Sequence, residues 1–245
     1  DAEGNIEYIG KRYVTARREM GYIVGSSIGS QTIHIKDTVL KVVVGDDLSR
    51  MEDLDEEIDA IISVNARRYG KGILSRRLDK MSRLAFAEGR NLILVNQVGG
   101  SGDIVYDGTS GILNSDGRLV MLLKSFDEDM QIFDTKAENA PIDVPFTTYN
   151  DRTRMIYEAA CLGLRDYFHK NGYKKACIGL SGGIDSAVVA CLAVGALGKE
   201  NVRVLLMPSP YTPNESVEDA KKLAENLGVE YSVLPIIEVY NAMVG

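Results

Sequence analysis

Hydrophobic and polar residues are patterned differently in the two halves of this 245-residue chain. Up to about residue 135, short apolar runs are separated by polar turns, which is typical of β-strands. From residue 152 on, short apolar runs alternate with longer segments whose apolar positions recur every three or four residues. The pattern therefore predicts a β-rich first half and an α/β second half.

In the first half we expect a hairpin and one helix among several short strands. The hairpin turn is Asn114-Ser115-Asp116-Gly117, whose Asp-Gly pair favours left-handed conformations. The helix covers 77–89, with apolar side chains on one face and Gly89 at its end. The expected strands cover 6–9, 32–35, 39–44, 58–64, 91–95, 110–113, 119–123 and 130–133.

Residues 138–150 contain two prolines and no regular period, so they are the expected linker between domains at 1–137 and 151–245. The second domain is expected to have short connections and a parallel, right-handed, doubly wound sheet, which binds ligands beyond the carboxyl ends of its strands. Its expected elements are helix 152–170, strand 176–180, helix 184–197, strand 202–206, a helix opened by a capping box at Ser216, and strand 231–235.

Composition and charge narrow the classes of function. The net charge of -7 and the pI of about 5.0 leave no electrostatic footprint for a nucleic acid. No apolar run is long enough to span a bilayer, and the first residues lack the features of a signal peptide. We therefore expect a cytoplasmic protein with no membrane partner. The absence of an initiator Met and the end of the chain inside an expected helix predict a fragment of something longer.

The cysteines and histidines are isolated in the sequence and indicate no metal or redox site. Cys161, Cys177 and Cys191 have no CxxC spacing and are expected to be buried, reduced thiols. His34 and His169 have no neighbouring metal ligands, so a solvated or core-edge position is expected for each.

The segment Ser181-Gly182-Gly183-Ile184-Asp185-Ser186 lies between an expected strand and a helix of small residues. Glycines let a backbone approach an anion, and N–H groups at the start of a helix point at it. Both serines can add donors, and the acid Asp185 is compatible with phosphates when a Mg²⁺ ion lies between them. We therefore expect an ATP and Mg²⁺ site, with a simple tight turn as the alternative. The spacing is neither GxxxxGK[ST] nor GxGxxG.

This loop resembles the pyrophosphatase loop of the ATP pyrophosphatases, which include GMP, asparagine and NAD⁺ synthetases. The segment 206–228, beginning Leu206-Met207-Pro208, is similar to NAD⁺ synthetase. The resemblance implies an adenine nucleotide alpha hydrolase-like fold and ATP-dependent adenylation of deamido-NAD⁺, with pyrophosphate leaving and ammonia attacking. It implies that ATP and pyrophosphate are bound by Ser181, Gly182, Gly183, Asp185, Ser186 and Met207, with Asp185 on the metal. For Met207, packing remains an equal alternative.

The first half resembles the nitrilase-type amidase domain of glutamine-dependent NAD⁺ synthetases, an α/β sandwich. The matching stretches are Asn96–Gly100 and Val105–Ser110, and the domain order agrees as well. In that family a Glu–Lys–Cys triad releases ammonia from glutamine through a cysteine thiolate. The resemblance also suggests a homo-oligomer.

The chain departs from that family at the nucleophile. Asp46-Asp47-Leu48 sets the alignment, and the position of the cysteine is then Gly45. Lys11 matches the lysine of the triad loosely, and Asn65-Ala66-Arg67-Arg68 replaces a Ser-Ala-Ser-Pro-like segment. We therefore expect that glutaminase activity is lost. Two other readings stay open: a non-catalytic, nucleotide-binding scaffold, and an ATP pyrophosphatase that acts on a nucleotide base, which the segment 207–211 disfavours.

Overall fold

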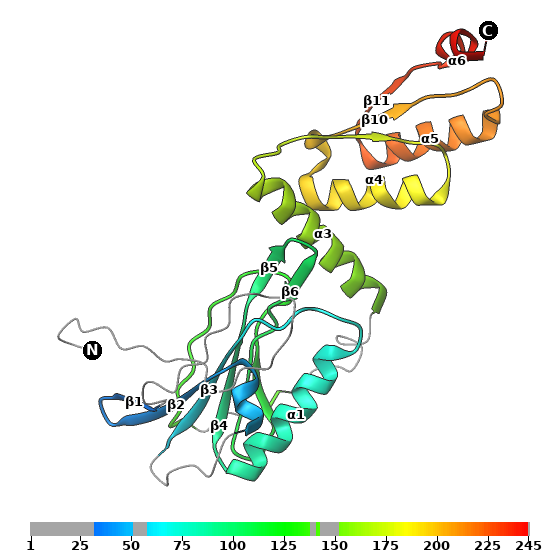
Figure 1. Ribbon diagram of the computed structural model, residues 1–245. Coiled ribbons are helices and arrows are strands. Elements are labelled where there is room, and N and C mark those ends of the chain that lie inside the picture. Colours follow the sequence, from blue (N-terminus) through cyan, green and yellow to red (C-terminus); the bar gives the residue numbers. More distant parts are fainter. Residues whose placement is uncertain (1–31, 51–57, 138–140, 143–151, 245) are drawn as a thin grey trace. The chain divides into compact units, whose positions relative to one another are not determined.

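A computed structural model of the chain describes residues 32–50, 58–137, 141–142 and 152–244. The chain divides into two compact units (Figure 1). The first unit comprises 1–99 and 104–152, and the second comprises 100–103 and 153–245. Within the described residues no helix is long and apolar enough to cross a membrane. The expected strand at 6–9 and Lys11 lie outside the described residues.

The first unit is built on a mixed sheet with the strand order β1-β2-β3-β4-β7-β8. Strands β2, β3 and β4 are parallel, and the others join them antiparallel. The parallel strands end together, since Val44 pairs with Val64 and Asn65 pairs with Asn96. The segments that follow them therefore meet at one edge of the sheet. The strands are β1 (Thr32–Ile35), β2 (Thr38–Val44), β3 (Ala60–Asn65), β4 (Asn91–Asn96), β7 (Gly111–Leu113) and β8 (Leu119–Leu122).

Helix α1 (Ile73–Glu88) covers one face of this sheet (Figure 1). Its buried Met81 and Ala85 join a core cluster with the strand residues Ile61 and Leu92. The helix begins at Ile73, before the predicted residue 77. The residue that precedes it, Gly72, is in a left-handed conformation and marks the helix start. It ends as predicted at Gly89, which is also left-handed. The described residues also form η1 (Gly45–Arg50) and a hairpin of β5 (Val98–Ser101) and β6 (Ile104–Asp107), in which β5 ends within the segment 100–103 of the second unit.

The second unit contains a parallel three-stranded sheet with the order β11-β10-β9. Helices α4 and α5 lie on the same side of it (Figure 1), as two right-handed crossovers require. The small side chains of Ala190 and Ala224 let these helices pack closely around Val204. The predicted α/β class is confirmed. The elements are α3 (Arg152–Lys170), β9 (Ala176–Gly179), α4 (Ile184–Leu197), η2 (Lys199–Asn201), β10 (Val202–Leu206), α5 (Asn214–Leu227), β11 (Glu230–Val233) and α6 (Ile237–Val244).

Several local expectations are wrong. Residues 130–133 form no strand, and Met130 and Ile132 are 87% and 91% exposed, since no neighbouring strand pairs with them among the described residues. Helix α5 begins at Asn214 after Pro213, with no side-chain cap, so Ser216 does not open it. Pro213 is the N-cap, with φ -60° and ψ 140°, the extended conformation that is usual at this position.

The cysteines also differ from expectation. All three are free thiols, but only Cys161 is buried, whereas Cys177 is exposed and Cys191 is half-buried. Cys177 is exposed because it lies on β9, an edge strand of the three-stranded sheet within the described residues.

Candidate functional site

The segment 181–186 leads from β9 into the first turn of α4. The Ser181 hydroxyl accepts a hydrogen bond from the Gly183 N–H at 3.2 Å and lies 3.0 Å from the Ser186 hydroxyl. The Ser186 hydroxyl in turn donates to the Gly183 carbonyl at 3.0 Å and accepts from the Ser181 N–H at 3.2 Å. The structure thus brings both predicted serines together and fixes the loop at the start of α4, where N–H groups favour an anion.

Gly182 is the most constrained residue of this loop. Its φ of +82° lies in the left-handed region. A Cβ at this position would overlap the Ser216 carbonyl oxygen and lie 2.8 Å from the Ser216 carbonyl carbon. By contrast, Gly183 has an ordinary φ of -88°, and the nearest atom to its Cβ would be the Ser181 hydroxyl at 3.4 Å. Glycine is therefore required at 182 both by the torsion and by the close approach of α5.

A cavity of about 220 Å³ opens beside the loop. Its volume is below the roughly 300–1,000 Å³ of pockets that enclose a whole drug-sized ligand, so it fits one end of a nucleotide. Met207 is 49% exposed in its wall, and its side chain lies over Gly179, where an added Cβ would be 3.2 Å from the Met207 Cε. The lining residues are Gly179, Leu180, Ser181, Leu206, Met207, Pro208, Thr212, Ser216 and Val217.

Asp185 is an exposed residue in the first turn of α4. Among the described residues there is no group of three or more His, Cys, Asp or Glu side chains that could hold a metal ion. Mg²⁺ commonly binds through one or two carboxylates together with phosphate oxygens and water. A single exposed carboxylate beside the serine loop fits that mode of binding, in which the nucleotide supplies the other ligands.

In the first unit, Gly45 follows β2 directly and begins η1. Its φ of +63° places it in the left-handed region, at a sharp turn from a strand into a helix. Asn65 and Asn96 end the two neighbouring parallel strands, so these residues lie at the same edge of the sheet as Gly45.

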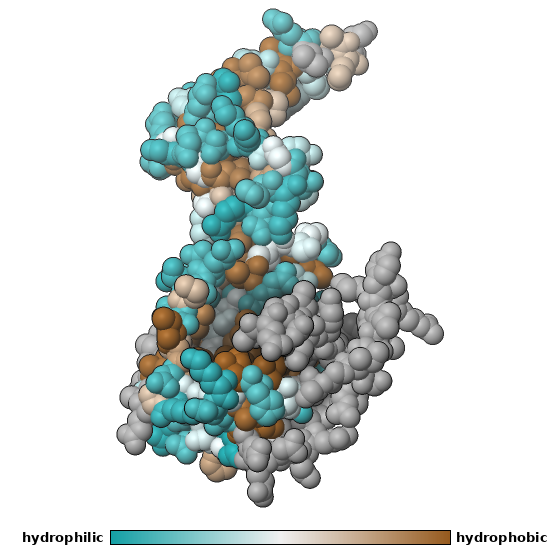
Figure 2. Space-filling model, turned by 90° about the vertical axis from the view of Figure 1, so that its left-hand side faces the viewer, coloured by the Kyte–Doolittle hydropathy of each residue, from teal (hydrophilic) through white to brown (hydrophobic). Residues whose placement is uncertain are grey.

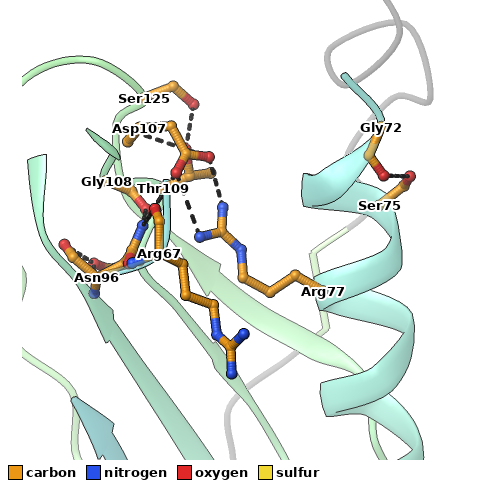
Figure 3. A network of polar contacts seen from close by, with 10 residues as sticks. Arg67, Gly72, Ser75, Arg77, Asn96, Asp107, Gly108, Thr109 and Ser125 are labelled. Carbon is orange, nitrogen blue, oxygen red and sulfur yellow. Dashed lines mark hydrogen bonds and ion pairs between the residues drawn. The ribbon is translucent and has the colours of Figure 1, made fainter. Parts of the chain in front are cut away.

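A buried polar network holds this edge together (Figure 3). The Arg77 Nη2 of α1 donates to the Asp107 Oδ2 at 2.6 Å, and both side chains are buried. The Asn96 Nδ2 donates to the Asp107 Oδ1 at 3.1 Å and to the Gly108 carbonyl at 2.9 Å. The Asn96 side-chain oxygen accepts from the Arg67 N–H at 2.8 Å. The residues thus join α1, the end of β4 and the end of β6, which indicates a structural role.

Sequence reasoning missed parts of both regions. Ser216, which the pattern predicts as a helix cap, lines the cavity, and its backbone lies close to Gly182. Arg77 was placed at the boundary of a helix, but it is buried and paired with Asp107. The position of Ser216 soon after the carboxyl end of β10 is the one feature of the sequence that indicates a place at the ligand site, because ligands bind at this end of such sheets.

Comparison with known proteins identifies the second region. Residues 156–245 match the NAD synthase family. The chain is 38% identical over 192 residues to a glutamine-dependent NAD(+) synthetase of Synechocystis sp., covering 76% of the chain and 34% of that relative. It is 36% identical over 224 residues to the Aquifex aeolicus protein of the same description, covering 75% of the chain and 38% of the relative. The resemblance to glutamine-dependent NAD⁺ synthetases is confirmed.

A solved structure of an NAD⁺ synthetase agrees with this assignment. The glutamine-dependent enzyme of Acinetobacter baumannii, in complex with ADP, is similar at a TM-score of 0.75 and 30% identity, covering 91% of this chain and 43% of that one. The Cytophaga hutchinsonii enzyme shares the fold at a TM-score of 0.69 and 18% identity, covering 88% of this chain and 42% of that one. The chain thus spans well under half the length of the NAD⁺ synthetases it matches.

Proposed function

We propose that the protein is an NAD⁺ synthetase, a carbon–nitrogen ligase that amidates deamido-NAD⁺ with ATP through an acyl-adenylate. The observation that carries the proposal is the serine–glycine loop at the start of α4, beside a small cavity, in a segment that matches the NAD synthase family. Relatives are described as glutamine-dependent NAD(+) synthetases, and one was solved with ADP.

In the proposed site, this chain's residues bind and orient the nucleotide. The cavity beside Met207 holds one end of ATP, and the loop at Ser181, Gly183 and Ser186 holds the phosphates. Fixed N–H and hydroxyl donors stabilise the charge that develops on the leaving pyrophosphate. When bound, Mg²⁺ supplies further charge neutralisation, and Asp185 is the residue that would hold it.

The test of this proposal is product formation by the intact protein. With deamido-NAD⁺, ATP, Mg²⁺ and ammonium, we expect NAD⁺, AMP and pyrophosphate to form in equal amounts. Chromatography measures the three products. ATP binding without any product would instead support a nucleotide-binding scaffold. Xanthosine monophosphate as the preferred acceptor would support another ATP pyrophosphatase.

Replacing Asp185 by asparagine is expected to weaken the dependence of the reaction on Mg²⁺. The isosteric amide keeps the volume but removes the charge, so the Mg²⁺ concentration for half-maximal rate should rise about tenfold, as expected for the loss of a charged partner worth about 1.4 kcal/mol. The matched control is Glu225→Gln in the last turn of α5, which should leave that concentration unchanged. Equal Mg²⁺ dependence in Asp185→Asn and the parent would remove Asp185 from the metal site.

We propose further that ammonia does not come from glutamine hydrolysis in the first unit. The supporting observation is Gly45, which has no side chain to act as a nucleophile at the turn after β2. We expect NAD⁺ formation by the intact protein with ammonium and only background formation with glutamine as the nitrogen source. Comparable rates with both nitrogen sources would show that glutaminase activity is retained.

The domain assignment, location and assembly of the protein belong to the same proposal. We assign 1–137 to a nitrilase-like amidase domain, 138–150 to a linker and 151–245 to the ATP pyrophosphatase domain. A cytoplasmic location agrees with three free cysteines and with the use of ATP. A homo-oligomer agrees with the exposed apolar side chains of Ile184, Val188 and Val189 on α4. Figure 2 shows hydrophobic residues interspersed with hydrophilic ones at the surface. Light scattering of the intact protein tests the assembly.

A further inference from the structure

Two tyrosines from separate elements meet beyond the carboxyl ends of β10 and β11. Tyr211 belongs to the segment 207–213 that follows β10, and Tyr240 belongs to α6, which follows β11. Their rings make an edge-on contact with centroids 5.9 Å apart at 76°, and their hydroxyl oxygens are 3.4 Å apart. Tyr211 is 76% exposed and Tyr240 is 36% exposed, and this contact joins their side chains.

The segment 207–213 forms a wall of the nucleotide cavity, since Met207, Pro208 and Thr212 line it. Its start is tied to the end of β11: the Leu234 N–H donates to the Leu206 carbonyl at 2.8 Å, and the Ile236 N–H donates to the Pro208 carbonyl at 3.2 Å. Beyond Pro208 its hydrogen bonds are local. The Ser209 N–H donates to the Thr212 hydroxyl at 2.9 Å, and the Tyr211 N–H donates to the Ser209 hydroxyl at 3.2 Å.

This arrangement leaves the tip of the wall dependent on the aromatic contact. The segment is anchored at both ends, at Pro208 to the residues after β11 and at Pro213, whose carbonyl accepts from the Ser216 and Val217 N–H groups of α5. Between these ends, local bonds fix the shape of the turn, and the contact with Tyr240 is what joins its Tyr211 side chain to α6. Hydrogen bonding to Tyr211 raises the pKa of the Tyr240 hydroxyl, with burial as the lesser cause, so the Tyr240 hydroxyl is uncharged at neutral pH.

We propose that Tyr240 is a positioning residue of the nucleotide site, which braces Tyr211 and thereby holds the Met207–Thr212 wall against the bound nucleotide. The inference rests on the proposed function, because it assigns α6 a part in ATP binding. Tyr240 contacts Tyr211, and its effect on ATP passes through the wall. Its loss should therefore change how tightly ATP binds and leave the chemical step alone.

The experiment compares three variants of the intact protein by ATP titration calorimetry and steady-state kinetics. Tyr240→Ala should bind ATP about threefold to tenfold more weakly, the range expected for one aromatic pair. It should raise the KM for ATP by the same factor with kcat nearly unchanged. Tyr240→Phe keeps the ring contact and should restore most of the affinity. Hydrogen exchange at 207–213 should be faster in Tyr240→Ala alone.

The matched control is Tyr173→Ala. The ring of Tyr173 makes a similar edge-on contact with that of Phe168, with centroids 5.8 Å apart at 73°. Tyr173 precedes β9, so it lies at the amino end of the strand, whereas the cavity lies at the carboxyl end. Equal ATP affinity in Tyr240→Ala and the parent would overturn the inference while leaving the proposed function intact. An equal loss in Tyr173→Ala would also overturn it, as a general loss of stability. Absence of ATP binding by the parent would overturn the proposed function, and the inference with it.

Discussion

Replacing Gly182 by alanine is expected to weaken ATP binding by about 100-fold, or about 3 kcal/mol. A residue with a Cβ loses about 1–2 kcal/mol in the left-handed conformation, and Gly182 has a φ of +82°. The added carbon would also overlap the Ser216 carbonyl, which is backbone in the first turn of α5 and has little room to move. The loop must therefore shift away from the position in which it holds phosphates. Titration calorimetry with ATP measures the effect.

Gly183→Ala is the matched control, one residue along the same loop. Its φ of -88° suits any residue, and its Cβ would approach only the Ser181 hydroxyl at 3.4 Å. We expect a change of less than about fivefold in ATP affinity, in the range of ordinary surface substitutions and small shifts. Circular dichroism should be unchanged in both variants. Similar affinities for the two alanine variants would contradict the role assigned to the Gly182–Ser216 approach.

Asp107→Ala is expected to destabilise the first unit by about 3–5 kcal/mol, because it leaves the buried Arg77 guanidinium without its counter-charge. The same carboxylate also accepts a hydrogen bond from Asn96 at 3.1 Å, so a second buried donor loses its partner. Faster hydrogen exchange in α1 and β4 would report the loss within this unit. A change of less than about 1 kcal/mol would contradict the structural role given to the network.

Two further variants separate charge from packing. Arg77→Met combined with Asp107→Leu removes both charges and should recover much of the stability that Asp107→Ala loses. Lys124→Ala removes an ion pair with Asp127 whose side chains are 63% and 65% exposed, and it should cost no more than about 1 kcal/mol. All of these variants lie in the first unit, so their free energies of unfolding can be compared directly.

The sequence alone predicted those elements whose signal is local. The loop at 181–186 was found because its glycines, serines and flanking strand and helix are adjacent in the chain. The hairpin around Asp116-Gly117 was found for the same reason. The strand expected at 130–133 failed, because an apolar pattern indicates that a segment can pair and does not indicate that a partner edge is available.

The remaining parts of both regions depend on contacts between distant residues. Arg77 and Asp107 are 30 positions apart, and an arginine in a helix normally faces water, so nothing in its surroundings indicated burial. Ser216 fits the pattern of a helix cap, but the N-cap of α5 is Pro213. Ser216 therefore lies within the first turn of the helix, where it lines the cavity. The contact between Tyr211 and Tyr240 likewise joins two segments that no periodicity connects.

At the left-handed turn of Gly45, a reactive side chain and a stable backbone make opposite demands on one residue. Any residue with a Cβ would hold this turn under about 1–2 kcal/mol of strain, so a reactive side chain placed here loosens the unit that carries it. Glycine relieves that strain completely. We therefore expect the first unit with glycine at this turn to resist heat and denaturant better than the same unit with a cysteine.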